Sequence, residues 1–367
     1  MAETFALDES EVQEHFFDSG WTDGLPIIAP TTDRVKAMLW AGEVEPDELL
    51  GAVPHRNVSV SAEKVAINAV MAGCKPEYFR VVLAAMQAVL DPGFNAHAAV
   101  TSTGGAALCL VVSGPIADEI GMNSLHNALG PGNRANATIG RAVRLVAMNV
   151  LGAKPGELDG TSLGHPGKFT FCFAESSPPA GWAPLRTELD YPEDDTTVTV
   201  VASEGPRQIA NAQNPDGWGI LRTFAAAMMT PSTYSVGKGH QVVLVLGPEH
   251  AAAIHGDGIS RAEAREFLAH ETRVTPAALE DAGVVIEEGY QHDMSPGSDG
   301  RLPVVPSPDD IFLVTAGGAG AGWSAYIPAW APKQHSRAAT RRVRLSGDAL
   351  PACGPAGCEI DWDEETK

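Results

Sequence analysis

Two short stretches decide the fold, Leu110-Val-Val-Ser-Gly-Pro115 and Val243-Leu-Val-Leu-Gly-Pro248. Each is an apolar run with the length of a buried strand, and each ends in a Gly-Pro step. Proline is well tolerated at the first position of a helix, because the N–H that it lacks would have no partner within the helix. Each stretch therefore predicts a buried strand that turns directly into a helix.

The surroundings of these two stretches also repeat. Downstream, Asn133-Arg-Ala-Asn-Ala137 matches Ser260-Arg-Ala-Glu-Ala264, and both begin with a residue suited to cap a helix. Upstream, Val58-Ser-Val60 matches Val198-Thr-Val200. Because the matches keep their order, we expect an α/β (or α+β) protein of two duplicated units, related by a pseudo-twofold axis with a cleft between them. Small-molecule sites are common at such junctions.

This repeat divides the chain into five segments. We expect an N-terminal arm over 1–54 with the turn Asp23-Gly-Leu-Pro26, a first unit over 55–160, a connecting strand and Pro-rich loop over 161–195, a second unit with a Gly-rich loop over 196–345, and an acidic tail over 346–367.

Composition restricts the classes of function. The 25 basic and 46 acidic side chains leave a formal charge of −21, whereas nucleic-acid binding and anionic lipid binding both need clustered Lys and Arg. No apolar run approaches the ~20 residues of a membrane helix, and the first ten residues lack the features of a signal peptide. The five cysteines form no paired framework, which favours a reducing compartment. We expect a cytoplasmic protein that binds neither nucleic acid nor membrane.

The segment Met122–Arg144 is the richest candidate site, because a Gly-Pro-Gly turn precedes a predicted helix there. Glycines let a backbone approach a ligand, and N–H groups at a helix start favour an anion. A guanidinium can add a forked contact to a carboxylate or phosphate. The predicted substrate-binding residues are Asn127, Gly130, Gly132, Asn133, Arg134 and Asn136. The alternative is a capped helix whose Asn side chains bond turn backbone.

Cys74 is the candidate nucleophile or redox thiol. It lies between Gly73, a predicted helix end, and Lys75-Pro76, a predicted helix start. A helix N-terminus and a neighbouring Lys both stabilise a thiolate, so we expect its pKa to lie below the ~8.5 of free cysteine. A small buried residue is the alternative. The candidate partners for proton transfer are His126, Lys168 and Glu175.

The Gly-rich loop Ala316–Trp323 follows a predicted strand over 311–315. Its glycines fit the dinucleotide pattern poorly, so we expect it to close over the cleft with Trp323 and Ser324 near the ligand. The chain has no His-Glu-x-x-His and no Cys-x-x-Cys, so no metal is expected and any cofactor stays unknown. The role of Cys353 and Cys358 in the tail is left open: they could form a disulfide or bind an adventitious metal.

Four segments resemble a largely uncharacterised family of bacterial proteins. They are Gly20-Trp-Thr-Asp-Gly-Leu-Pro26, Ala72-Gly-Cys-Lys-Pro-Glu-Tyr78, Gly130-Pro-Gly-Asn-Arg-Ala-Asn-Ala-Thr-Ile-Gly140 and Gly164-His-Pro-Gly-Lys168. That family is similar to proteins that are found beside, or fused to, a small redox domain. The motif of this redox domain is selenocysteine or cysteine, followed by Gly, Ser and Cys. The resemblance covers about residues 15–345. This chain has no Cys-Gly-Ser-Cys segment, so the resemblance implies a separate redox protein as a partner.

From these features we expect an enzyme that acts on a small anionic organic substrate in the cleft between the units. Thiol-linked lyase, hydrolase and oxidoreductase chemistries all stay open. We also expect a homo-oligomer. The alternative is a non-catalytic binding or assembly subunit of a redox or metabolic complex, in which the loops form an interface.

Overall fold

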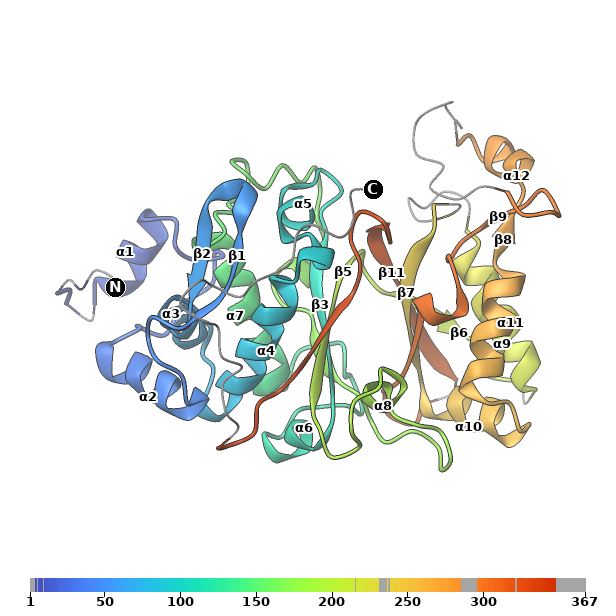
Figure 1. Cartoon of the computed structure of the whole chain (residues 1–367), viewed down its shortest axis with the longest axis horizontal. Coiled ribbons are helices and arrows are strands. Elements are labelled where there is room, and N and C mark those ends of the chain that lie inside the picture. Colours follow the sequence, from blue (N-terminus) through green and yellow to red (C-terminus); the bar gives the residue numbers. More distant parts are fainter. Residues whose placement is uncertain are drawn as a thin grey trace, which may run out of the picture.

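Helices cover both outer sides of one mixed eight-stranded sheet (Figure 1), so the protein is a mixed α/β structure. The computed structural model describes residues 4, 6–8 and 10–347, apart from 215, 231–235, 237, 285–295 and 321. Cys353, Cys358 and nearly all of the expected acidic tail lie outside the described residues. No helix in the described part of the chain has the length and apolar character needed to cross a bilayer.

The central path of the sheet runs in the order β10-β7-β11-β5-β3-β4. Its strands are β3 (Ala107–Ser113), β4 (Cys172–Ala174), β5 (Thr197–Ser203), β7 (His240–Leu246), β10 (Ile311–Thr315) and β11 (Trp323–Pro332). On one side, β5 is antiparallel to β3, and β3 is parallel to β4. On the other side, β11 is antiparallel to β7, and β7 is parallel to β10. The two sides meet where β11 pairs with β5, at Ala329 and Ser203.

Two strands cross from one side of the sheet to the other. β6 (Arg207–Ala210) follows β5 in the chain but pairs with β11, whereas β12 (Ala339–Arg342) follows β11 but pairs with β5. The expected boundary at residue 196 therefore does not coincide with a break in the sheet, because β5 pairs with β3 along its whole length. Each side of the sheet is completed by a strand from the other part of the chain.

Both faces of the sheet are buried. In β3, Leu110 faces the core beneath the first set of helices, whereas Val111 faces an inner core shared by both sides. In β7, Leu244 faces a second core, which lies beneath the second set of helices, and Val245 faces the inner core. This burial on both faces explains why these strands are continuous apolar runs rather than alternating ones.

The edges of the curved sheet come together beyond β4 and β10. Ser176 donates its N–H to the carbonyl oxygen of Thr315 at 2.7 Å, and the Thr315 hydroxyl donates back to the Ser176 carbonyl oxygen at 2.7 Å. The inner core, which includes Phe173, Val201 and Ile327, lies within the curve.

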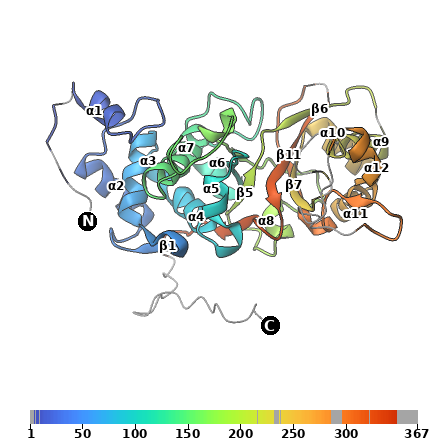
Figure 2. The ribbon, with the colours of Figure 1, turned by 90° about the horizontal axis from the view of Figure 1, so that it is seen from above.

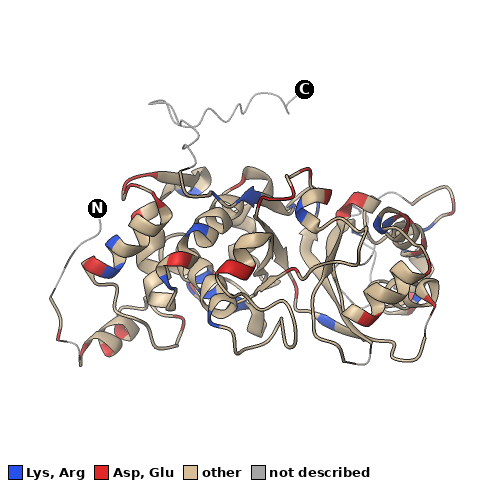
Figure 3. Cartoon of the chain, turned by 90° about the horizontal axis from the view of Figure 1, so that it is seen from below, with Lys and Arg blue, Asp and Glu red and all other residues tan. Residues whose placement is uncertain are grey.

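Different helices cover the two sides (Figure 2). The first set is α3 (Ala62–Ala72), α4 (Phe79–Val89) and α7 (Arg134–Asn149), and the second is α9 (Gly217–Met228), α10 (Pro248–Gly256) and α11 (Arg261–Glu271). The shorter elements are α5 (Ala96–Thr101), α6 (Pro115–Glu119), α8 (Leu185–Glu188), α12 (Pro276–Asp281), β8 (Arg273–Val274) and β9 (Leu302–Pro303). The second set carries more acidic residues than the first: α10 and α11 contain Glu249, Glu263, Glu266 and Glu271, whereas the first set contains only Glu63 of α3 (Figure 3).

The N-terminal segment packs against the first set of helices. It contains α1 (Val12–Asp18), α2 (Thr32–Gly42), β1 (Leu49–Val53) and β2 (Val58–Ser61), and its side chains join the first core. β1 and β2 form a separate two-stranded sheet. Val58–Val60 and Val198–Val200, which match in sequence, therefore lie in different sheets and have no equivalent pairing.

Candidate functional site

The first turn of α7 keeps two backbone donors available. The Asn133 side chain caps the helix by accepting the N–H of Asn136 at 3.0 Å, and its amide donates to the Gly121 carbonyl oxygen at 2.7 Å. Among the described residues, the N–H groups of Arg134 and Ala135 have no acceptor. Such donors at a helix start are where an anion is favoured.

Arg134 is held beside this turn by the end of α3. Its Nε and Nη2 donate to the Gly73 carbonyl oxygen at 3.0 and 2.9 Å, while the residue as a whole stays exposed. One edge of the guanidinium is thus used inside the protein, and only the edge that carries Nη1 faces away from Gly73. A forked contact to a ligand from the Nε edge is not available in this arrangement.

The neighbouring Asn side chains hold the loop itself. Asn136 accepts the N–H of Asn123 at 2.9 Å and donates to the Asn123 carbonyl oxygen at 2.8 Å. Asn127 donates to the Pro131 carbonyl oxygen at 2.7 Å, and its side chain occupies the space that a Cβ at Gly130 would need. Gly132 has φ +123° and open space beside it, so only its backbone conformation requires glycine. Asn127 and Asn136 match the alternative of turn-bonding side chains.

Cys74 is a buried thiol. Burial raises its pKa to about 12, an effect that a side-chain hydrogen bond with Thr138 and the charge of Arg134 only partly oppose. The thiol also donates to the Thr138 carbonyl oxygen. The expectation of an acidic thiol at this position was therefore wrong, because the desolvation cost of a thiolate exceeds the favourable terms. Its chain neighbours form the expected helix end and 3₁₀ start, but the side chain belongs to the first core.

Lys168 lies in an ion cluster that precedes the short strand β4. It ends the 3₁₀ turn Pro166–Lys168, and β4 begins only at Cys172. Its Nζ donates to both carboxylate oxygens of Asp159, at 3.0 and 2.8 Å, and Arg144 donates to the same carboxylate at 2.8 Å. Burial lowers the pKa of Lys168, and the hydrogen bonds to Asp159 oppose that shift. Thr161 also bonds Asp159.

Glu175 is buried at the junction of both sides. Its carboxylate accepts the Ser113 hydroxyl at 2.5 Å and the N–H of Leu185 at 2.9 Å, and it lies 3.6 Å from Nη2 of Arg261. Burial raises the pKa of Glu175, whereas the charge of Arg261 lowers it. The side chains of Glu175 and Arg261 are 2% and 3% exposed, so this pair lies away from solvent.

The loop that carries His126 meets the Gly-rich loop. Gly317 donates its N–H to the Ser124 carbonyl oxygen at 2.9 Å, and the exposed His126 ring packs so closely on Gly318 that a Cβ there would lie 2.1 Å from Nδ1. Gly320 donates to the Glu249 carboxylate of α10 at 2.7 Å. The Gly-rich loop follows the carboxyl end of β10, which is parallel to β7, and this end of parallel strands is where ligands commonly bind.

Ser324 forms a hydrogen-bonded chain with a residue that the sequence patterns missed. Its Oγ accepts the N–H of Gly247 at 3.0 Å and lies 2.6 Å from Nδ1 of the buried His250, whose Nε2 lies 3.2 Å from the Asn211 carbonyl oxygen. A carbonyl oxygen only accepts, so Nε2 carries a proton and, in the neutral ring, Nδ1 accepts the Ser324 hydroxyl proton. The sequence did contain a signal for His250. The step Gly247-Pro-Glu-His250 has a histidine where the matching step after β3, Gly114-Pro-Ile-Ala117, has alanine.

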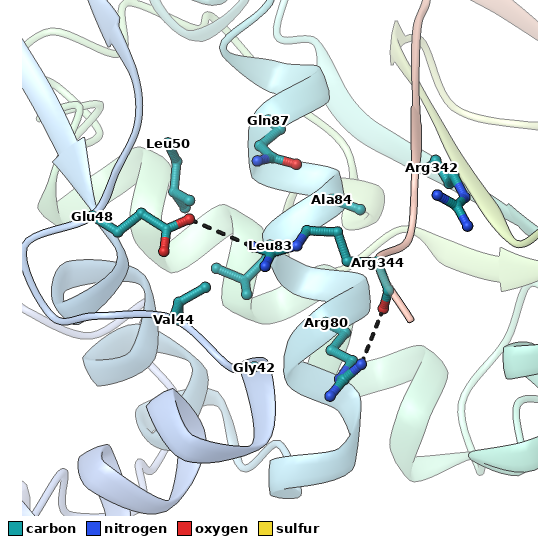
Figure 4. Close-up of a pocket in the computed structure, with 10 residues that line it drawn as sticks. All are labelled: Gly42, Val44, Glu48, Leu50, Arg80, Leu83, Ala84, Gln87, Arg342 and Arg344. Carbon is teal, nitrogen blue, oxygen red and sulfur yellow. Dashed lines mark hydrogen bonds and ion pairs between the residues drawn. The ribbon is translucent and has the colours of Figure 1, made fainter. Parts of the chain in front are cut away.

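A small hollow, with a volume of only about 10 Å³, lies between α2, α4 and the segment after β12 (Figure 4). Its arginines are committed to the protein: Arg80 donates to the Ala41 carbonyl oxygen and to Glu43, and Arg344 pairs with Glu48 at 3.5 Å. Hydrogen bonds from Gly347, Ser346 and Arg80 lower the pKa of Glu43 to about 2. None of the sequence-predicted site residues lines this hollow.

The structure therefore groups the candidate residues in separate places. The anion-binding candidates of α7 and His126 share one loop region, and that region contacts the Gly-rich loop near Trp323 and Ser324. Lys168 and Glu175 lie in separate ion clusters, and Cys74 lies in the core. In the described part of the chain, no group of three His, Cys, Asp or Glu side chains is arranged to hold a metal ion. The chain matches no model of a known protein family and no curated protein.

Proposed function

We propose that this protein is an enzyme that acts on a small organic anion, bound where the first turn of α7 meets the loop 121–132. One observation carries the proposal: two hydrogen bonds to Gly73 fix the guanidinium of Arg134, whose own backbone N–H, like that of Ala135, has no acceptor among the described residues. A fixed cation next to free N–H groups favours binding of a carboxylate or phosphate group.

The proposed proton-transfer group is His126, on the same loop. It is exposed and packs on Gly318, so the loop joins the anion-binding turn to the Gly-rich loop. Histidine is the side chain that most often serves as a general acid or base. Because the Cys74 thiol is buried with a raised pKa, the chemistry favoured here is a lyase or hydrolase reaction that does not use a thiolate. Oxidoreductase chemistry would require the separate redox protein that the sequence resemblance implies.

We further propose that the two sides of the sheet are duplicated units related by a pseudo-twofold axis at the β5–β11 junction. The strand order and directions are the same on both sides, and β6 and β12 are exchanged reciprocally. The contact between Ser124 and Gly317 then joins one unit to the other beside the proposed site.

Ligand binding by Arg134→Ala tests the anion site. Removing the guanidinium is expected to weaken binding of simple carboxylates or inorganic phosphate by about 1.5–3 kcal/mol, the usual contribution of a hydrogen bond to a charged group. Calorimetry and the melting temperature are measured on the same sample. Arg34→Ala is the control, because Arg34 is an exposed arginine that also donates to a backbone carbonyl, that of Ala29. Unchanged affinity with a lowered melting temperature would contradict the assignment.

Turnover is tested by incubation with cell metabolites and detection of products by mass spectrometry. We expect a product with the native protein and at least a 100-fold slower reaction with His126→Ala, since a positioned acid–base group contributes about 10²–10⁴-fold. His270→Ala is the matched control, because the His270 side chain is 80% exposed and lies 3.1 Å from the carboxylate of its neighbour Glu271. Absence of any product would remove the enzyme proposal.

A second candidate function is assembly, as a homo-oligomer or as a subunit of a complex. Leu125, Leu129 and Trp323 belong to the two loops that meet and are 58%, 37% and 51% exposed. Apolar side chains exposed together are typical of interaction surfaces. Sedimentation of the native protein and of Leu125→Ser tests this candidate: a loss of mass in the variant supports assembly through these loops, and a monomeric native protein contradicts it.

A further inference from the structure

We propose that Ser324 is a nucleophile and His250 its general base, so that the protein hydrolyses carboxylic esters with a small acyl group. This inference rests on the proposed function, because that function left lyase and hydrolase reactions open and the inference specifies a hydrolase. It adds a covalent step and a base that none of the sequence patterns assigned.

The hydrogen-bonded chain orients the two groups for this role. The Asn211 carbonyl oxygen fixes the proton on Nε2 of His250, so that Nδ1 is left to accept the Ser324 hydroxyl proton at 2.6 Å. A nucleophile that bonds a base, which is itself oriented by a third group, is the arrangement that activates a hydroxyl. Phe224 packs edge-on to the His250 ring, with ring centroids 5.8 Å apart, and this contact also restrains the ring.

The other side of the sheet shows that a helix turn of this kind needs no histidine. There, the Thr196 hydroxyl accepts the N–H of Ile116 at 3.0 Å after the matching Gly114-Pro115 step, and Ala117 stands where the second turn has His250. That hydroxyl accepts an N–H two residues after Gly114, whereas Ser324 accepts the N–H of Gly247 itself, so each turn uses a hydroxyl but at a different position. The base beside Ser324 is therefore an addition to the shared turn and is not explained by capping.

The position also suits a reaction with a small molecule. Ser324 is buried, with 8% of the residue exposed, and it follows Trp323, which is 51% exposed, at the start of β11. The adjoining loop carries the N–H groups of Gly318 and Ala319, for which the described residues provide no acceptor. Donors of this type stabilise an oxyanion. The narrow exposure of Ser324 favours a short acyl group such as acetyl.

The reaction balances without any cofactor. Oγ of Ser324 attacks the carbonyl carbon of the ester while its proton passes to Nδ1 of His250. Collapse of the tetrahedral intermediate breaks the bond to the alkoxide, which takes that proton from Nδ1 and leaves as the alcohol. Water then attacks the acyl-serine, again giving a proton to Nδ1, and release of the carboxylic acid returns the proton to Ser324. The sum is ester plus water to acid plus alcohol.

Covalent labelling of the full chain with methanesulfonyl fluoride tests the proposal. We expect one methylsulfonyl group, located by peptide mapping on Ser324, and a labelling rate at least 100-fold lower in His250→Gln, as expected for loss of a general base. Thr196→Ala is the control, because it removes the hydroxyl of the matching turn and is expected to keep the labelling rate. Circular dichroism checks that each variant is folded.

Hydrolysis of p-nitrophenyl acetate supplies the second readout, with a burst of nitrophenol expected in the native protein and none in Ser324→Ala. Absence of label on the folded native protein, or label on a residue other than Ser324, would overturn the proposal whether or not the variants fold. Turnover of a metabolite that depends on His126, with no label on Ser324, would overturn this inference alone. Absence of both turnover and label would overturn it together with the proposed function.

Discussion

The Sγ of Cys74 donates a hydrogen bond of 3.3 Å to the carbonyl oxygen of Thr138, in the second turn of α7. The contact joins the end of α3 to α7 across the first core, and Arg134 reinforces it with its two bonds to Gly73. The thiol is therefore part of the packing between helices. The loop that precedes α7 is positioned by this packing, so the proposed anion site depends on a residue that was first considered for its chemistry.

Cys74 is expected to resist alkylation in the folded protein. Its pKa of about 12 exceeds the reference value of 9.0, which leaves on the order of 10³-fold less thiolate at neutral pH, and burial also blocks the reagent. Iodoacetamide labelling at pH 8, followed by peptide mapping, measures this with and without urea. Only the unfolded chain should be labelled at Cys74 at the rate of a free cysteine. Equal rates in both states would show that the thiol is accessible and that its pKa is not raised by the fold.

Asp159 is expected to make folding sensitive to acid. Burial raises its pKa, but hydrogen bonds from Lys168, Thr161 and Arg144 outweigh burial and lower the pKa to about 2, against 3.8 as the reference value. The unfolded chain then binds more protons between these values, so this contribution is complete above about pH 5 and is lost as the pH falls towards 2.

The measurement for Asp159 is urea unfolding at pH 7 and at pH 3. The native protein should lose more free energy of unfolding over this range than Asp159→Asn, which has no carboxylate to protonate there. Lys168→Met removes one donor and should give an intermediate loss. The same pH dependence in all three proteins would show that the cluster does not hold the carboxylate ionised.

Arg261→Ala is expected to lower the free energy of unfolding by about 3–5 kcal/mol, because it leaves the buried Glu175 without its nearest cation. Arg222→Ala is the matched control: it removes an ion pair with Asp216 in which the Arg222 side chain is 60% exposed, and such pairs contribute about 0–1 kcal/mol. Urea denaturation of both variants provides the comparison. Similar losses in the two would mean that Arg261 does not compensate the buried charge.

Two glycines at opposite ends of α10 should respond differently to alanine. A Cβ at Gly247 would lie 2.0 Å from the Trp323 carbonyl oxygen, whereas a Cβ at Gly256 would have no neighbour within 4 Å. Gly247→Ala is expected to destabilise the fold by at least about 1–3 kcal/mol, as overpacking does. Gly256→Ala should leave stability unchanged or raise it by up to about 1 kcal/mol. Thermal unfolding measures both, and an equally stable Gly247→Ala would contradict the close strand-to-helix turn.

Short stretches of the sequence are sufficient to specify the local features of this protein. The runs that end in Gly114-Pro115 and Gly247-Pro248 are buried strands that turn into helices, and Asn133 and Ser260 cap α7 and α11. These features follow from the φ and N–H of a few neighbouring residues and from apolar patterning, so they can be identified without knowing what lies across the fold. They also placed the loop before α7 beside a helix start.

The pairing of strands and the contacts between distant side chains depend on the packing of the whole chain. The exchange of β6 and β12, the burial of Cys74, the contact of His126 with Gly318 and the bond between Ser324 and His250 each join residues distant in sequence. Pairing depends on which apolar faces fit together, and a pKa depends on how much water the whole fold removes from a group. Cys74 shows the difference: its helix-start neighbours favour a thiolate, but desolvation by the packed core outweighs them.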